Sequence, residues 1–175
     1  LFGAGHPMLY PLAALLGCDL FDSSSYAKYA KREDMMFSEG TKKLGELDYL
    51  GCECPVCTSH TAEELKESDD EEKERLIAEH NLWICFKEMR KIKQAISEGS
   101  LWELVERRVR GHPKLLDTLK GIDEEYIFLE RFEPRSRKRA LRSTGRETHY
   151  RPAIKRIKKW VFKSYVLPNE GPTIH

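Results

Sequence analysis

Three cysteines within six residues constrain this chain more than any other feature. They are Cys52, Cys54 and Cys57, and His80 follows them after a short helical span. Three thiols are an odd set, and a disulfide needs particular separations between its Cα and Cβ atoms. Three thiolates and one imidazole instead complete the closed tetrahedral shell of a structural zinc site. The sequence therefore predicts one structural Zn²⁺ per chain, against the alternative of ordinary loop cysteines.

Three side chains compete to be the fourth ligand. His60, three residues after Cys57, would close a compact knuckle, whereas His80 would close a longer loop from the early turns of a helix, and spacing permits both. Cys85 is expected to be a small core side chain instead. It falls on an apolar stripe with steps of three and four, which predicts one buried helix face made by Ala78, Leu82, Cys85, Met89, Ile92 and Ile96. His80 lies on the other side of that helix, where it could face the cysteine loop.

Composition excludes two classes of protein. No apolar run approaches the roughly 20 residues that span a membrane, and no signal peptide is visible. Unpaired Cys18 and Cys85 beside a metal-binding cluster suit a reducing compartment, so we expect a cytoplasmic protein rather than a disulfide-rich secreted one. Because the chain begins at Leu1 rather than at a methionine, and residues 1–5 resemble the end of a strand, we also expect it to be a fragment.

The net charge of +1 hides a strong asymmetry. Residues 63–79 are mostly acidic, whereas thirteen cations between residues 131 and 163 stand against only Glu133 and Glu147. Aromatic side chains are interleaved with those cations, which is the electrostatic pattern of a nucleic-acid partner, although a solvated charged face would look similar. This change of composition predicts a boundary after Phe132. With the cysteine cluster opening a second segment at residue 51, the chain divides into residues 1–50, 51–132 and 133–175.

The start of the chain predicts the end of a parallel βαβ unit. An apolar helix over residues 7–16, ended by Gly17 as a left-handed cap, separates residues 1–5 from a short buried strand over residues 18–22. Ligand sites in such α/β folds lie at the carboxyl ends of strands, where Asp22 stands. Further helices are expected over residues 70–97, 101–110, 113–130 and 152–165, with a capping box at Thr61, a stop at Gly99 and a loose tail over 168–173.

Several of these motifs occur together, in this order, in a known family. Gly3-Ala4-Gly5-His6-Pro7-Met8, Phe21-Asp22-Ser23, the cysteine cluster with His80-Asn81, and later His112-Pro113 and Phe132-Glu133-Pro134 resemble the archaeal branch of the tRNA-guanine transglycosylases. The resemblance implies an α/β fold: the C-terminal portion of a (β/α)8 TIM barrel with a zinc-binding subdomain, followed by a mainly helical basic segment. Residues 1–5 and 18–22 would then be the seventh and eighth strands, and His80 rather than His60 the fourth zinc ligand.

The same resemblance implies an activity and its residues. The family exchanges guanine in the D-arm of archaeal tRNA for 7-cyano-7-deazaguanine, the precursor of archaeosine, and it dimerises through the zinc subdomain. Asp22 matches the nucleophile that would form a covalent aspartyl-ribosyl intermediate, Phe2 matches the ring that packs on the base, and Gly3 matches a close backbone approach. The plainer readings are a cap among the serines for Asp22 and a core side chain for Phe2.

The resemblance also sets a limit on what the isolated chain should do. The family's second aspartate and most base-recognition residues belong to earlier strands, so we expect these 175 residues alone to exchange no base. Two other readings remain open at this point. One is a non-catalytic, zinc-stabilised tRNA-binding subunit or an archaeosine synthase paralogue, and the other is a zinc-dependent interaction module.

Overall fold

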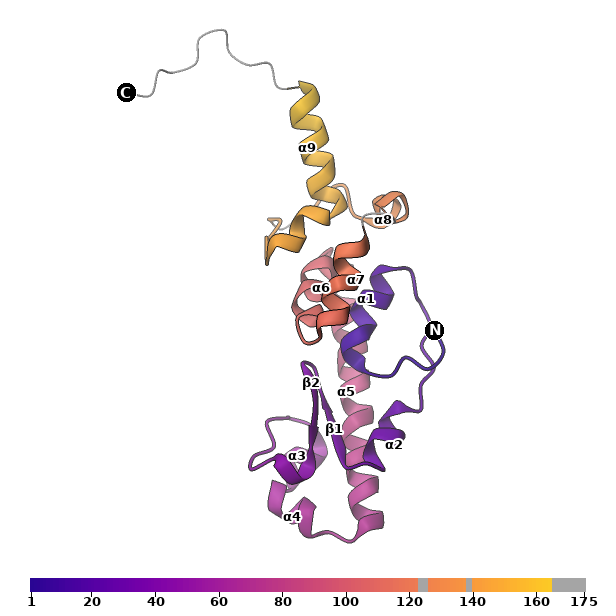
Figure 1. The fold of residues 1–175 in the computed structure, drawn as a ribbon, viewed down its shortest axis with the longest axis vertical. Helices are drawn as coiled ribbons and strands as arrows, with labels where there is room; N and C mark the ends of the chain where they lie inside the picture. Colours follow the sequence, from indigo (N-terminus) through magenta and orange to yellow (C-terminus); the bar gives the residue numbers. More distant parts are fainter. Residues whose placement is uncertain (123–125, 138–139, 165–175) are drawn as a thin grey trace, which may run out of the picture.

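The computed structural model describes residues 1–122, 126–137 and 140–164 of the chain, and every structural statement below concerns those residues. They form a mainly helical molecule with one two-stranded antiparallel hairpin (Figure 1). The α-helices, 3-10 helices (η) and strands are, in chain order, η1 (Pro7–Leu9), α1 (Tyr10–Leu15), α2 (Ser25–Ala30), β1 (Asp34–Phe37), β2 (Gly40–Lys43), η2 (Leu44–Glu46), α3 (Pro55–Ser59), α4 (Ala62–Glu67), α5 (Asp70–Glu98), α6 (Leu101–Val109), α7 (Pro113–Gly121), α8 (Tyr126–Phe132), η4 (Arg146–Tyr150) and α9 (Pro152–Ser164).

The long helix α5 runs through the middle of the molecule, and elements from both sides of it in the sequence pack along its length (Figure 1). It begins where the Asp69 side chain accepts a hydrogen bond from the backbone N–H of Glu72, and it ends at Gly99, whose φ of 69° is the left-handed cap that the sequence predicts. The hairpin, α2, α3 and α4 pack against its first half, and α1 and α6 pack against its second half. The first group, with the cysteine cluster, is called the metal unit below.

Apolar side chains form three cores. The first lies inside the metal unit and consists of Ala30, Met35, Leu44, Leu47, Cys54, Val56, Ala62, Leu65, Leu76 and Ile77. The second joins α1, α6, α7 and α8 through Leu12, Trp102, Val105, Val109, Leu119, Ile122 and Leu129. The third, smaller core links the N-terminal segment to α5 through Ala4, Tyr10, Ile92, Ala95 and Leu104. An ion pair between half-buried Arg108 and buried Glu88, with Nε to Oε1 at 2.6 Å, also joins α6 to α5.

The predicted buried stripe of α5 is correct only in part. Ile92 is 2% exposed and belongs to the third core, and Cys85 and Met89 are half-buried against that core. Leu82 and Ile96 are 36% and 55% exposed, and in the first half of α5 the buried face runs through Ile77, His80 and Ile84. The period of the apolar residues was read correctly, but a polar residue can lie on the buried face when its hydrogen bonds are satisfied there, as those of His80 and Asn81 are. Cys85 keeps its expected core role in part, since it is half-buried against the third core.

One other predicted helix differs in the structure, and another agrees. The helix expected over residues 113–130 is divided, because α7 ends at Gly121 and α8 begins at Tyr126. A glycine gives a helix its greatest loss of backbone entropy, so Gly121 is a natural end. The helix expected over 152–165 is α9, while Tyr165 and the tail over 168–173 lie outside the described residues.

The predicted pair of parallel strands is reduced to a single bridge. Residues 18–22 do not form a continuous strand, but Phe2 and Asp22 make an isolated parallel β-bridge, with Gly3 N to Asp22 O at 2.8 Å and Asp22 N to Leu1 O at 3.0 Å. Two short segments can exchange only a few ladder hydrogen bonds with each other, whereas strands inside a parallel sheet are paired on both edges. The intervening helix is η1 followed by α1, and Gly17 ends it with a φ of 90°, as predicted.

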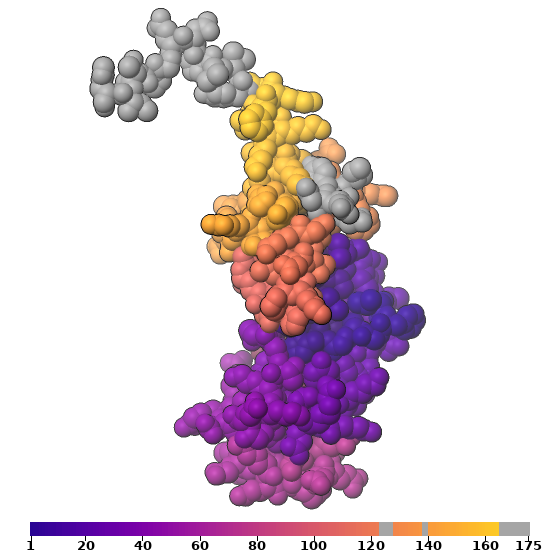
Figure 2. Space-filling view, in the orientation of Figure 1, coloured from indigo at the N-terminus to yellow at the C-terminus, as the bar shows by residue number. Residues whose placement is uncertain are grey.

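Helix α9 projects from the body of the molecule (Figures 1 and 2). Only its first turn, with Pro152 and Ala153, is buried. From residue 157 onward its side chains are exposed, and they include Trp160 and Phe162 at 68% and 86%. No helix in the described ranges combines the length and the apolar character needed to cross a membrane.

Candidate metal centre and strand-end site

The cysteine cluster and His80 meet at one point of the metal unit. One potential ligand atom from each of Cys52, Cys54, Cys57 and His80 lies within 4.8 Å of the others, and His80 Nδ1 is 3.3 Å from both the Cys54 and the Cys57 sulfurs. A tetrahedral Zn²⁺ with bonds of about 2.3 Å to sulfur and about 2.1 Å to nitrogen separates its ligand atoms by roughly 3.5 to 3.8 Å. The four donors therefore fit a closed Cys3His metal site.

Local backbone structure aims the sulfurs inward. Cys54 is the N-cap of α3, where its sulfur accepts the backbone N–H of Cys57 at 3.4 Å, and Pro55 follows at the first helical position. The Cys52 sulfur accepts the backbone N–H of Cys54 at the same distance. Backbone donors of this kind favour the thiolate form that a metal needs.

His80 is held in the tautomer that leaves one nitrogen for a metal. Its Nε2 lies 2.9 Å from the Met36 carbonyl oxygen, which can only accept, so Nε2 carries the hydrogen and Nδ1 faces the sulfurs with its lone pair. The side chain is fully buried. A backbone carbonyl bound to the far nitrogen is the usual way in which proteins orient a metal-ligating imidazole.

Asn81 is a structural partner of this site, and the sequence assigned it no role of its own. It is fully buried, and its Oδ1 accepts the Met36 N–H at 2.7 Å while its Nδ2 donates to the carbonyls of Tyr26 and Asp34 at 3.1 and 3.0 Å. One side chain thereby fixes β1 and α2 on α5, next to His80. The adjacent His80-Asn81 pair was visible in the sequence, but nothing in it indicated that the amide would satisfy three backbone groups.

The pKa values of the three thiols are shifted by their closeness to one another and by burial. The pKa of Cys54 is lowered to about 3, first by the hydrogen bond from the Cys57 thiol and then by His80, whereas the pKa of Cys57 is raised by its neighbour Cys54 and by burial. Burial is also the main reason that the pKa of Cys52 is raised. A divalent cation would take the place of the protons that these sulfurs otherwise share.

The two rival ligands lie elsewhere. His60 Nδ1 is 3.1 Å from the Val56 carbonyl oxygen at the end of α3, outside the cluster. Cys85 accepts a hydrogen bond from the Tyr10 hydroxyl at 3.6 Å, and burial raises the pKa of its thiol. Of the alternatives that spacing left open, the geometry brings only His80 to the three cysteines.

The three residues assigned to base exchange lie together at the strand-end bridge. Phe2 and Asp22 are in register on adjacent segments, and the N–H of Gly3, whose φ is 68°, donates to the Asp22 carbonyl. Both side chains are exposed, that of Phe2 to 88%. No atom comes within 4 Å of a Cβ built on Gly3, so this glycine leaves the backbone open to a ligand. This edge is the candidate chemical site.

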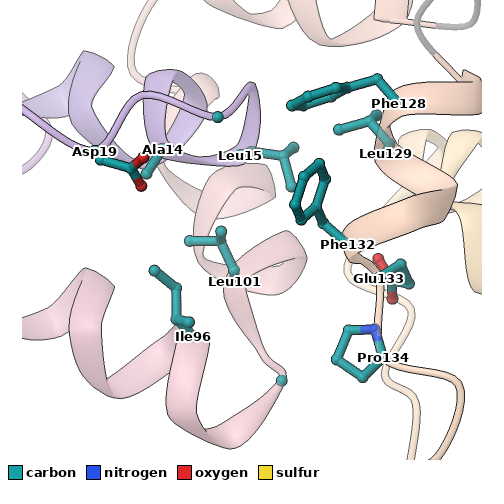
Figure 3. Close-up of a pocket in the computed structure, with 12 residues that line it drawn as sticks. Ala14, Leu15, Asp19, Ile96, Leu101, Phe128, Leu129, Phe132, Glu133 and Pro134 are labelled. Atoms are coloured by element: carbon teal, nitrogen blue, oxygen red, sulfur yellow. The ribbon is translucent and has the colours of Figure 1, made fainter.

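A separate pocket lies between α1, the end of α5, α6 and α8 (Figure 3). Its wall is mainly apolar and includes Leu15, Leu101, Phe128 and Phe132. Among its described lining residues the ionisable groups are Asp19 and Glu133, and Glu133 already pairs with Arg151. The pocket therefore carries no set of groups suited to catalysis, and Asp22 does not line it.

These features define a class of protein before any comparison is made: a helical unit with a buried Cys3His metal site, attached to an exposed strand-end site that bears a carboxylate and an aromatic ring. The model of the queuine tRNA-ribosyltransferase family matches residues 1–114. The chain belongs to that family.

Curated relatives extend the match beyond residue 114. The chain is 50% identical to the tRNA-guanine(15) transglycosylase of Archaeoglobus fulgidus over 170 residues, which cover 97% of this chain and 35% of that protein. It is also 50% identical to the enzymes of the same name from Pyrococcus abyssi and Methanocaldococcus jannaschii, over 91% of this chain and 27% and 25% of those proteins. The chain thus spans about a quarter to a third of the length of these relatives.

Proposed function

We propose that this chain carries the nucleophile of a tRNA-guanine transglycosylase, which exchanges guanine in the D-arm of tRNA for 7-cyano-7-deazaguanine. The observation that carries the proposal is the bridge that pairs Phe2 with Asp22 in a chain of this family. It is what the last two strands of a TIM barrel would produce at their carboxyl ends, where such barrels hold their active sites. The names of the relatives favour this reading over a non-catalytic subunit or an archaeosine synthase paralogue.

The chemistry needs a carboxylate at this position. The ionised Asp22 carboxylate would attack ribose C1′ as the bond from C1′ to the guanine nitrogen breaks, through an oxocarbenium-like state, and a second acid would protonate the departing guanine. The nitrogen of 7-cyano-7-deazaguanine would then attack the same carbon, lose its proton and release the carboxylate. In this scheme the Phe2 ring stacks on the base, and the open backbone at Gly3 lets the base approach. By resemblance, the second acid belongs to an earlier barrel strand.

The test is Asp22→Asn in the full-length protein. Exchange of 7-cyano-7-deazaguanine into tRNA should fall by about 10³-fold or more, as expected for loss of a nucleophile, while tRNA binding is kept. A tRNA–protein adduct on a denaturing gel should form with the wild type and be absent with the variant. Asp19→Asn is the matched control, since Asp19 is an exposed aspartate three residues away. Unchanged exchange in Asp22→Asn would refute the role of Asp22.

The C-terminal basic segment supports tRNA as the partner, but with fewer cations than its sequence offers. Arg137, Arg151 and Arg156 pair with glutamates of the body, whereas Lys158, Lys159 and Lys163 are exposed on the projecting α9 (Figure 2). These lysines would contact phosphates, with Trp160 and Phe162 available to stack on bases.

Salt dependence tests this part of the proposal. Changing Lys158, Lys159 and Lys163 together to Gln should weaken tRNA binding. A plot of the logarithm of the binding constant against the logarithm of the salt concentration should also become less steep, by about 0.7 to 0.9 per lost phosphate contact. Lys42→Gln and Lys93→Gln, exposed lysines of the metal unit and of α5, are the controls. An unaltered slope in the triple variant would remove α9 from the RNA surface.

Three further elements of the proposal concern the metal unit and its setting. The donor set suits Zn²⁺, whose bound form would stabilise the unit rather than react. The exposed Tyr49 and Phe86 side chains support a homodimer formed through this unit, and sedimentation of Phe86→Asp as a dimer would count against that contact. Free thiols at Cys18 and Cys85 support a cytoplasmic location, which stays a prediction.

A further inference from the structure

The pentapeptide Gly-His-Pro-x-Leu occurs twice in the chain, at residues 5–9 and 111–115. In both copies the histidine caps a helix whose first residue is the proline. The ring Nδ1 accepts the backbone N–H two residues further on, at 3.1 Å for His6 and 3.2 Å for His112. The local role of the two histidines is therefore the same.

The second ring nitrogen distinguishes them. His6 Nε2 lies 3.2 Å from the carbonyl oxygen of Gly40, and because a carbonyl only accepts, this nitrogen carries the hydrogen. Gly40 begins β2, so the bond joins the N-terminal segment to the tip of the metal unit's hairpin. His112 is exposed, and within the described part of the chain its ring makes only the capping bond.

The junction around His6 is closely packed. A Cβ built on Gly111 would lie 2.3 Å from Met8 Sδ and 2.8 Å from the carbonyl oxygen of Glu39, so only a glycine fits there without a shift. The backbone just before α7 thus lies against the backbone of the hairpin tip and against the side chain of Met8. Such contacts leave little room for the hairpin tip to move independently of His6.

A continuous set of bonds leads from the metal site to this junction. His80 donates to Met36 in β1, Asn81 accepts from the same residue, and β1 pairs with β2 up to Gly40. The Gly40 carbonyl then accepts from His6, which is three residues from Gly3. The links from His80 to His6 are hydrogen bonds and a strand pair, and the last step from His6 to Gly3 runs along the backbone.

We propose that His6 is a positioning residue through which the metal unit holds the base-binding loop of Phe2 and Gly3 in place. The proposal rests on the function proposed above, because it takes these two residues as the base-binding loop. It assigns the metal a second effect besides stability: an ordered metal unit presents Gly40 at a fixed point, and His6 transmits that position to the loop. Loss of either end of the link should loosen the loop without changing the nucleophile.

The kinetic test distinguishes the capping role of His6 Nδ1 from the Gly40 bond of Nε2, in the full-length, metal-loaded protein. His6→Asn can still cap the helix but is too short to reach Gly40, so KM for 7-cyano-7-deazaguanine should rise roughly three- to tenfold, the range for one hydrogen bond, with kcat changed less than twofold. His6→Gln places an amide nitrogen near the position of Nε2 and should restore KM to within about twofold. His112→Asn, the matched change in the second copy, should alter neither constant.

Hydrogen exchange supplies a readout that does not require activity. In the wild type, chelation of the metal should speed amide exchange in residues 1–5, where Gly3 N–H is bonded to Asp22. His6→Asn should show the faster exchange already and gain little on chelation, whereas His112→Asn should behave as the wild type.

Two results would overturn the proposal: an unchanged KM in His6→Asn, or an equal response of residues 1–5 to chelation in the wild type and in His6→Asn. If the wild type did not exchange guanine for 7-cyano-7-deazaguanine, the proposed function would fail. Amide hydrogen exchange would still decide whether His6 links the metal unit to the loop.

Discussion

The metal centre and the strand-end site differ in how completely this chain determines them. At the metal centre, the four donors all lie within residues 52–80. Hydrogen bonds within that range and from the hairpin orient them, and the His80 side chain has no solvent exposure. At the strand-end site, backbone bonds pair Phe2 with Asp22, but the Phe2 ring is 88% exposed and the carboxylate faces solvent. The metal site is closed by residues of this chain, whereas the strand-end site is open to solvent.

The difference has a physical origin. A structural metal site needs four ligands and a few orienting hydrogen bonds, which one loop and one helix can supply. A site for base exchange needs a base-sized cleft and two acids on separate elements, which a barrel assembles from many strands. The metal centre should therefore dominate stability, whereas the strand-end site should contribute to chemistry and little to folding.

The largest expected effect is that of removing the metal. Chelation, or Cys57→Ser, should destabilise the metal unit by several kcal/mol, because structural zinc sites contribute about 10 kcal/mol or more of apparent binding free energy to folding. Amide exchange should become fast throughout the first core and stay slow around Trp102 and Val105 in the second. The stability lost on chelation should shrink as pH falls, because protons compete with the metal for the same ligand atoms and the bound metal then stabilises the fold less.

His60→Ala is the control for this prediction. Its ring lies close in sequence to Cys57 but outside the donor cluster, so metal content and unfolding should match the wild type. Loss of metal in His60→Ala, or its retention in His80→Ala, would reverse the assignment of the fourth ligand. Equal loss of both cores on chelation would show that the metal unit is not a separate stability unit.

The next effect concerns the buried ion pairs that attach the basic segment. Arg151 is 1% exposed, and its guanidinium lies 2.7 Å from Glu133 Oε1 and 2.9 Å from Glu103 Oε1. Arg151→Met should lower the free energy of unfolding by about 3 to 5 kcal/mol, because two buried carboxylates lose a partner. Urea unfolding of the metal-loaded protein measures this, and Arg146→Met, an exposed arginine in η4, should change it by less than about 0.5 kcal/mol.

The pH dependence of stability is a second test of the ion pairs that Glu103 makes with Arg151 and Arg137. Burial alone would raise the pKa of Glu103, but its hydrogen bond with Arg151 and the charges of Arg151 and Arg137 together lower it below the ordinary 4.5. The stabilisation is therefore complete above about pH 4.5 and is lost as pH falls through the lowered value. The wild type should lose stability more steeply there than Arg151→Met. If the free energy of unfolding fell equally steeply with pH in the wild type and in Arg151→Met, Arg151 would stabilise the protein by packing rather than by its charge.

Sequence predicted the elements whose causes are local. The stop at Gly99 and the capping box at Thr61 each depend on residues within four positions, and both are in the structure. The cysteine spacing likewise indicated a metal cluster, because its ligands are chemically distinctive. The identity of the fourth donor was left open by spacing, and the structure brings His80 to the sulfurs.

Features that depend on distant partners could not be predicted in this way. The buried face in the first half of α5 is set by β1 and α2, whose backbone groups make burial of His80 and Asn81 favourable, so the apolar count found Ile92 but not these two polar residues. The basic segment was read as a single charged surface, yet Arg151 is buried and Arg137 is half-buried against Glu103. In both cases polar side chains are buried because their partners come from elsewhere in the chain, and no periodicity records that.

The smallest expected effect on stability is the one that separates the two sites most sharply. The bridge at Asp22 uses its backbone N–H and carbonyl, and its exposed carboxylate takes no part in the described hydrogen bonds or ion pairs. Asp22→Asn should therefore change the free energy of unfolding by no more than about 0.5 kcal/mol while abolishing exchange. A matched Asp34→Asn, which loses ion pairs with Arg32 and Lys43, should cost more stability but spare the chemistry. If Asp22→Asn unfolded the protein as Cys57→Ser does, the carboxylate would be a structural cap, and the contrast between the two sites would be lost.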